Sequence, residues 1–159
     1  MTRLAFTGHR GLPDDVERLI DDALRTELER FDATELVGYS SLADGADTVF
    51  AQAVLDLGGR LVAIIPSADY RDALPAAHRP VLDDLIVQAV EVVTLDFPQS
   101  TSESHMAAAR WFLDHAEELV AVWDGQPARG YGGTGDIVAL ARDRQIPVSV
   151  IWPDGAHRD

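Results

Sequence analysis

The chain has 159 residues, of which 47% are hydrophobic and 25% are charged. That composition is typical of a globular domain and excludes an intrinsically disordered chain. Cysteine is absent, which excludes disulfides, thiolate metal sites and cysteine nucleophiles, and no apolar run approaches the roughly 20 residues of a membrane span. The first residues do not form a signal peptide, so we expect a cytoplasmic protein.

The charge is strongly negative. Arginine supplies all 13 basic residues, and 27 acidic residues bring the formal net charge to -14. Such a surface repels a phosphate backbone, so we expect no general nucleic-acid binding and no attachment to a membrane. A small anion can still bind where a few arginines and backbone amides converge, because short-range donors outweigh a screened global field.

Short β-branched runs alternate along the chain with longer amphipathic stretches. The pattern predicts strands over residues 3–7, 35–39, 61–65, 90–95, 118–123 and 148–152. It predicts helices over residues 13–31, 46–57, 76–88, 101–116 and 135–144. Ser102 is the expected N-cap of the fourth helix, and residues 66–75 are expected to form a polar loop.

This alternation predicts an α/β fold. We expect a Rossmann-like, doubly wound, mainly parallel six-stranded sheet with helices on both faces, formed by residues 1–159 as a single domain. Residues 153–159 form a tail that could fray. Ligands of such sheets bind outside the carboxyl ends of the strands, so the loops that follow strands are the candidate site.

The loop over residues 124–136 contains five glycines between a predicted strand and a predicted helix. Glycines let a ligand approach the backbone closely, and the helix start offers free N–H groups to a phosphate. The Thr134 hydroxyl and the Arg129 guanidinium would add donors. The alternative is a surface loop capped by Asp136.

Three further loops follow strands, over residues 8–12, 40–47 and 66–74, and the first two carry candidate ligand-binding residues. Gly8, His9 and Arg10 come after the first strand and could bind a phosphate or carboxylate. The segment over residues 40–47 offers hydroxyls and a carboxylate, of which Asp47 could accept hydrogen bonds from ribose hydroxyls. The alternative for both loops is a helix-capping turn with solvated side chains.

Nucleophilic and metal chemistry have weaker support in the sequence. A triad of Ser40 or Ser41 with His9 and an aspartate can be imagined, but the closing glycine of a nucleophile elbow is missing. The other histidines are interpreted as ordinary surface residues, so we expect no metal site. The spacing of Gly130, Gly132 and Gly135 fits the dinucleotide fingerprint only formally, because it begins too far after its strand.

Three motifs together resemble the SLOG superfamily, which unites DNA-processing proteins of the Smf type with the LONELY GUY cytokinin-activating enzymes. They are Thr7–Arg10, Leu42–Asp47 and the glycine-rich loop with the Trp123 segment before it. The resemblance implies a Rossmann-like fold, a nucleotide or nucleotide derivative bound across the loops, no cofactor, and a homo-oligomer. The ligand-binding residues implied are Gly8, His9, Arg10, Ser40, Ser41, Gly45, Asp47, Asp124, Gly125, Arg129, Gly130, Gly132, Gly133 and Thr134.

The resemblance carries activity over less directly. LONELY GUY enzymes are phosphoribohydrolases that use an arginine and a glutamate of a Pro-Gly-Gly-x-Gly-Thr-x-x-Glu stretch. In this chain Arg129 and Asp136 are the corresponding catalytic candidates, and the acid is one methylene shorter. We therefore expect a nucleotide-binding protein, with a phosphoribohydrolase as one alternative and an oligomeric subunit with a vestigial pocket as the other. Phe112 is expected on the inner stripe of its helix, and Trp111 either packs on a neighbouring helix or forms a subunit contact; apolar residues such as these are compatible with a dimer or tetramer.

Overall fold

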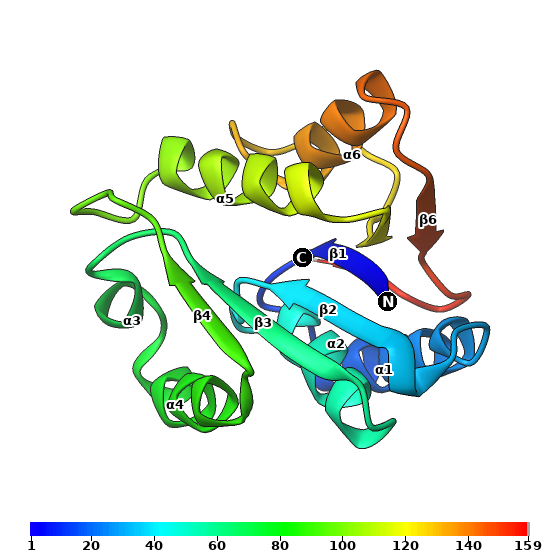
Figure 1. Ribbon diagram of the computed structural model, residues 1–159. Coiled ribbons are helices and arrows are strands. Elements are labelled where there is room, and N and C mark those ends of the chain that lie inside the picture. Colours follow the sequence, from blue (N-terminus) through cyan, green and yellow to red (C-terminus); the bar gives the residue numbers. More distant parts are fainter. Residues whose placement is uncertain (159) are drawn as a thin grey trace.

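A computed structural model describes residues 1–158, which fold around a six-stranded sheet in which every pairing is parallel (Figure 1). The strand order is β4-β3-β2-β1-β5-β6. The strands are β1 (Thr2–Gly8), β2 (Leu36–Ser40), β3 (Arg60–Ile65), β4 (Glu91–Thr94), β5 (Glu118–Val122) and β6 (Val148–Ile151).

Helices cover both faces of this sheet (Figure 1). Helices α5 (Ser102–His115) and α6 (Thr134–Asp143) lie on one face; α1 (Asp14–Leu28), α2 (Ala46–Asp56) and α4 (Arg79–Gln88) lie on the other. The short helix α3 (Tyr70–Ala73) and the 3-10 turns η1 (Ala33–Glu35) and η2 (Ala76–His78) belong to connections. The predicted doubly wound α/β fold is confirmed.

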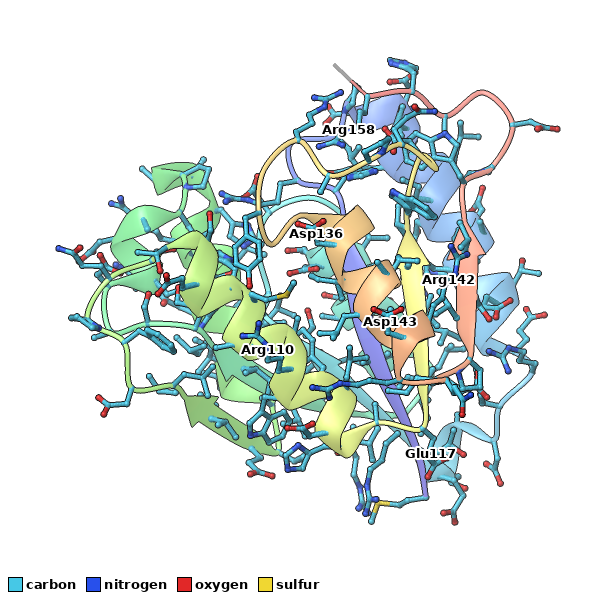
Figure 2. All side chains as sticks on the ribbon, turned by 90° about the horizontal axis from the view of Figure 1, so that it is seen from above. Arg110, Glu117, Asp136, Arg142, Asp143 and Arg158 are labelled. Atoms are coloured by element: carbon cyan, nitrogen blue, oxygen red, sulfur yellow. The ribbon has the colours of Figure 1, made fainter. Side chains whose placement is uncertain are left out.

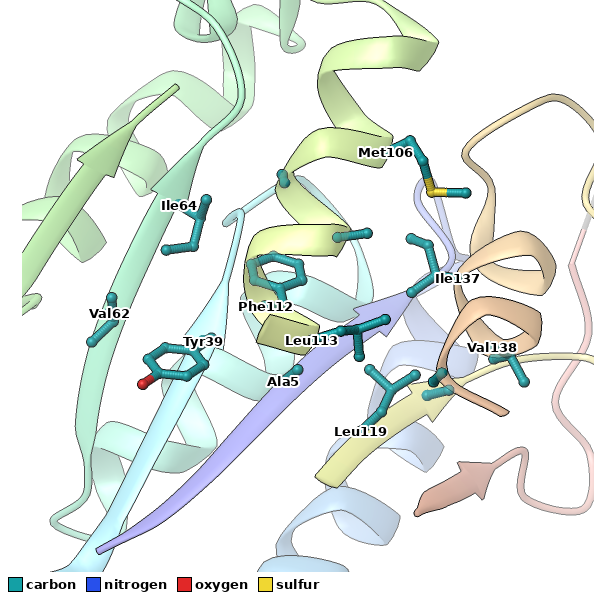
Figure 3. Close-up of a cluster of buried hydrophobic side chains, with 14 of the residues drawn as sticks. Ala5, Tyr39, Val62, Ile64, Met106, Phe112, Leu113, Leu119, Ile137 and Val138 are labelled. Atoms are coloured by element: carbon teal, nitrogen blue, oxygen red, sulfur yellow. The ribbon is translucent and has the colours of Figure 1, made fainter. Parts of the chain in front are cut away.

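The central strands are apolar on both faces because both faces are covered. All five residues of β2 are buried, as expected for a parallel strand between two helical layers. Figure 3 shows the layer in which Ala5, Tyr39 and Leu119 of the sheet pack against Phe112 and Leu113 of α5. On the opposite face the rings of Phe6 and Phe50 stack with centroids 4.4 Å apart.

Helix α1 follows directly from its sequence. Val16, Ile20, Leu24 and Leu28 recur every four residues and are buried on one stripe. Acidic residues fill the first turn, where the helix dipole favours negative charge, and Pro13 stands at the N-cap. The helix ends at Leu28, three residues before the predicted end at Phe31.

Two predicted elements begin differently in the structure. The N-cap of α5 is Thr101 and not Ser102, because the Thr101 hydroxyl and the Ser104 hydroxyl each bind the other residue's backbone N–H. The predicted loop over residues 66–75 contains α3, and its Tyr70 is buried. Proline at the second position of α4 explains why the regular helix starts only at Arg79.

The described part of the tail, residues 153–158, makes contacts with the rest of the protein, and its fraying stays a prediction. Ala156 packs against the core between the sheet and α1–α2, and the His157 ring lies 3.5 Å from the Asp15 carboxylate. Arg158 reaches the Asp124 carboxylate at 3.7 Å. In residues 1–158 there is no helix with the length and hydropathy to cross a bilayer.

The apolar residues of α5 pack within the chain, which confirms Phe112 on the inner stripe and favours packing over a subunit contact for Trp111. Phe112 is only 4% exposed and belongs to the core. Trp111 is half-buried, stacked on His115 with ring centroids 3.8 Å apart and in edge contact with Tyr39. These side chains are satisfied within the chain, so they are no argument for a homo-oligomer.

Candidate functional site

A cavity of about 230 Å³ lies at the carboxyl ends of the strands, where the loops after β1, β2 and β5 meet. The chain winds from β1 toward β2 on one side and returns to β5 on the other, and such a switch in winding direction opens a crevice for ligands. Ten of the predicted ligand-binding residues line this one cavity. They are Gly8, His9, Arg10, Ser41, Asp47, Arg129, Gly130, Gly132, Gly133 and Thr134.

The N-terminus of α6 forms one wall of the cavity. Its N-cap is Gly133, which has no side chain to cap the first turn, and Thr134 is the first residue of the helix. The first turn of a helix leaves N–H groups without intrahelical partners, and the helix dipole favours an anion there. This wall therefore has the chemistry of a phosphate or carboxylate site.

Gly132 is required by the shape of the glycine-rich loop. Its φ is +86°, and a Cβ there would lie 3.0 Å from the backbone oxygen of Ser102 in α5. The Gly132 N–H donates to Oδ2 of Asp136 at 3.0 Å. Asp136 thus fixes the loop to the first turn of α6.

Three arginines from separate parts of the chain line the cavity: Arg10, Arg129 and Arg158. Arg10 binds Oδ1 of Asp44 through Nε at 2.9 Å, which orients its guanidinium at the loop after β1. In Figure 2 Arg158 lies beyond the carboxyl ends of the strands, at the same end of the molecule as the start of α6, where Asp136 is labelled. In a chain of net charge -14 this is a local concentration of positive charge.

His9 connects the first loop to the loop after β5. Its Nε2 accepts the Asp124 N–H at 3.1 Å, and the edge of its ring contacts Trp152. Burial, and after it the charge of Arg158, lowers the pKa of His9, while the nearby Asp124 carboxylate opposes the shift. A neutral imidazole that accepts a backbone N–H holds the loops together.

Gly45 joins the first two loops. Its φ is +89°, and a Cβ at this position would lie 2.7 Å from the backbone oxygen of His9. The next residue, Ala46, donates its N–H to that same oxygen at 3.1 Å. The His9 carbonyl therefore accepts the first N–H of α2, and only glycine at position 45 leaves room for this contact.

Asp47 is a buried carboxylate in the wall of the cavity. Its Oδ2 accepts the Ala43 N–H at 3.1 Å. Burial raises the pKa of Asp47 to about 7, although the Ala43 hydrogen bond and the charge of Arg10 act in the opposite direction. The cavity thus combines a cationic wall with one acidic side chain.

Five predicted site residues do not line the cavity: Ser40, Gly45, Asp124, Gly125 and Asp136. Ser40 is fully buried and its Oγ accepts the Leu42 N–H at 3.0 Å, so its assignments as a ligand contact and as a nucleophile are wrong. Asp124 contacts His9 and Arg158, and its Oδ1 accepts the Gln126 N–H, so it shapes the loop.

Several residues that line the cavity were missed by sequence reasoning. Tyr70 lies in the connection after β3, at the same edge of the sheet as the other loops of the site. A large aromatic side chain is usually a packing residue, so Tyr70 gave no sequence signal of a site. Arg158 gave none because it lies in the tail. His105 was interpreted as a surface residue, yet it is half-buried beside Tyr70, with ring centroids 5.9 Å apart.

His78 is also misassigned as a surface histidine. It is buried, and its Nε2 lies 2.8 Å from the backbone oxygen of Leu42. Leu42 has φ of +59°, a conformation that non-glycine residues rarely adopt, and it directs this carbonyl toward the ring. His78 therefore supports the loop after β2. In residues 1–158 no three histidine or acidic side chains are grouped to hold a metal ion.

Comparison with solved structures finds this fold in proteins of low sequence identity. DNA processing protein A from Streptococcus pneumoniae matches with a TM-score of 0.70 and 19% identity, over 98% of this chain and 52% of that chain. DNA processing protein A from Helicobacter pylori, a single-stranded-DNA-binding protein, matches with a TM-score of 0.66 and 17% identity, over 98% and 67%. The molybdenum cofactor binding protein from Rippkaea orientalis matches with a TM-score of 0.62 and 15% identity, over 96% and 77%.

At 15–19% identity these matches show the Rossmann-like fold that the resemblance implied. The chain spans about half the length of the pneumococcal protein. No family model matches the sequence, and no curated protein matches it. Proteins with this fold bind DNA or a small molecule, so the ligand of this chain has to be argued from its own cavity.

Proposed function

We propose that this protein binds a nucleotide or a nucleotide derivative, with the phosphate of the ligand at the N-terminus of α6. The observation that carries the proposal is that Arg10, Arg129 and Arg158 line the same cavity as that helix start, in a protein of net charge -14. Arginine recognises phosphate through paired N–H donors, and helix N-termini bind anions. The arrangement supports binding of an anionic small molecule more directly than any reaction.

Single-stranded DNA is the other ligand that the fold relatives suggest. A DNA strand needs a basic groove that follows its backbone over several nucleotides. Three of the 13 arginines of this chain instead line one cavity of about 230 Å³, which suits a small anionic ligand. A small nucleotide is therefore the better proposal.

Hydrolysis of a nucleoside monophosphate has less support. Its candidate acid, Asp136, already accepts the Gly132 N–H and does not line the cavity. A catalytic carboxylate must reach the ribose of the substrate. We therefore propose binding as the function, and we assign Asp136 to shaping the glycine-rich loop.

Isothermal titration calorimetry with AMP, ADP-ribose and cyclic nucleotides tests the proposal, together with native mass spectrometry of the freshly purified protein. We expect binding of at least one of them, weakened roughly tenfold in Arg129→Gln because a charge-assisted hydrogen bond to phosphate is lost. Arg60→Gln is the matched control, because Arg60 is exposed at the start of β3 and does not line the cavity. Equal affinities of the two variants, or no binding by the wild-type protein, would contradict the proposal.

A further inference from the structure

The cavity has two chemically different sides, which come from opposite sides of β1. The side formed after β5 carries the start of α6 and Arg129. The side formed after β2 and β3 carries Asp47 of α2 and Tyr70 of α3. Because β5 and β2 flank β1 in the sheet, a ligand in the cavity touches both sides at once.

Tyr70 presents a polar group that nothing in the described chain satisfies. Its side chain is 1% exposed, and in residues 1–158 its Oη is buried without a hydrogen-bond partner. A buried hydroxyl without a partner costs roughly 1–3 kcal/mol, so native structures keep such groups for a reason. Burial, and after it the charge of Asp47, raises the pKa of Tyr70, so this hydroxyl stays protonated and remains a donor.

Asp47, on the same side of the cavity, has carboxylate oxygens that can accept further hydrogen bonds. Its Oδ2 takes the Ala43 N–H, whereas the two oxygens of a carboxylate can accept about four hydrogen bonds. Tyr70 and Asp47 line the same cavity, so a ligand in that cavity has both side chains in its wall. Within residues 1–158 Asp47 is the acidic side chain among those that line the cavity.

We propose that Tyr70 and Asp47 form a hydroxyl-binding subsite, so that the cavity takes the sugar-phosphate part of its ligand, with the phosphate at α6 and a sugar hydroxyl between Tyr70 and Asp47. This inference rests on the proposed function and adds to it the part of the nucleotide that the cavity holds and the residues that select it.

A hydroxyl complements this pair better than an amine does. Tyr70 offers a donor and Asp47 an acceptor, and a hydroxyl can accept from the first while donating to the second. An exocyclic amino group of a base only donates, so it would leave the Tyr70 O–H unpaired. A sugar hydroxyl therefore complements both groups through a single oxygen.

The size of the cavity agrees. Its volume of about 230 Å³ lies below the roughly 300–1,000 Å³ of sites that enclose a drug-sized molecule. The groove beside it, lined by Ser100, His105 and Tyr131 among others, shares Arg10 and three loop glycines with the cavity and gives the rest of the ligand a way out. A ligand with its sugar phosphate in the cavity and its base in the groove would fit both the cavity volume and the adjoining groove.

The test compares two ligands that share a phosphate and differ in hydroxyls, namely ribose 5-phosphate and methyl phosphate, by isothermal titration calorimetry. We expect Tyr70→Phe and Asp47→Asn each to weaken ribose 5-phosphate binding by roughly 3- to 10-fold and to leave methyl phosphate within twofold of wild type. Tyr39→Phe is the matched control, because Tyr39 is a buried tyrosine that does not line the cavity.

Stability separates this effect from a folding defect. Tyr70→Phe removes an unsatisfied hydroxyl, so the free variant is expected to unfold at the same temperature as the wild type or higher, while its ribose 5-phosphate affinity falls. Equal ribose 5-phosphate affinities of Tyr70→Phe and wild type would overturn the subsite but leave the phosphate site standing. If the wild type binds none of methyl phosphate, ribose 5-phosphate and AMP, the proposed function fails as well.

Discussion

The pKa of Asp47 gives the protein a pH dependence that a single substitution can isolate. Burial holds that pKa at about 7, so between about pH 4 and 7 the folded protein keeps a proton that the unfolded chain releases. The contribution of Asp47 to stability is therefore present at low pH and is lost as the pH rises through 7.

Relative to Asp47→Asn, we expect the wild-type free energy of unfolding to fall by about 2–4 kcal/mol from pH 4 to pH 8. Urea unfolding of both proteins over that range measures the difference. The comparison removes the opposite contributions of His9 and His105, whose pKa values are lowered mainly by burial and whose stability contributions grow as the pH rises. Parallel curves for the two proteins would show that Asp47 is ionised throughout.

Gly45 allows a second test at the scale of single residues. Gly45→Ala combines a positive φ with a contact of 2.7 Å to the His9 carbonyl, so we expect a loss of about 3 kcal/mol or more in the free energy of unfolding. Gly58→Ala is the matched control: its φ is +91°, and a Cβ there meets nothing within 4 Å, so about 1 kcal/mol is expected. Similar losses in the two variants would mean that the close contact of the loops contributes nothing.

At the scale of elements, residues with a periodic pattern were predicted well and those with special contacts were not. The strands and long helices follow from alternating apolar runs and were placed within a few residues. Gly8, Arg10 and Thr134 were assigned to the site because parallel strands bring their carboxyl ends to one edge. Ser40 was misassigned because successive side chains of a strand point to opposite faces of the sheet, and the side chain of Ser40 is buried in the protein.

The C-terminal segment escaped prediction for a physical reason. Residues 153–158 have no periodicity, and what holds them is a set of single contacts, among them Ala156 on the core and Arg158 on Asp124. No local pattern announces contacts between residues more than 30 positions apart. Tyr70 was missed similarly, because only its burial without a partner distinguishes it from a packing residue.

Arg158 makes this segment a part of the cavity, which gives a prediction for the element. We expect Arg158→Gln to weaken binding of a phosphate ester by roughly 3- to 10-fold and to raise the pKa of His9, since the charge of Arg158 helps to lower it. Calorimetry and NMR titration of the His9 ring measure the two effects. His157→Gln is the control, because His157 contacts Asp15 at 3.5 Å and does not line the cavity. An unchanged affinity in Arg158→Gln would remove the segment from the site.

At the scale of the whole molecule, charge and topology act on the same place. The protein carries 27 acidic residues, yet its cavity gathers three of its 13 arginines. Under the proposed function, this separation of charge would repel long polyanions through the global field and leave a local attraction for one small anion. Val87, the most exposed large apolar side chain of residues 1–158, lies just before the edge strand β4 and not in the cavity.

The central position of β1 also has a consequence for synthesis. This strand pairs with β5, so Phe6 has its strand partner only after Val120 has been synthesised. The cavity likewise needs both Arg10 and Arg158, which are far apart in the sequence. A ribosome synthesises proteins from the N-terminus onward, so a chain still being translated can have formed most of its helices and still lack the complete cavity. The cavity is therefore complete only after residue 158 has been synthesised and β1 has paired with β5.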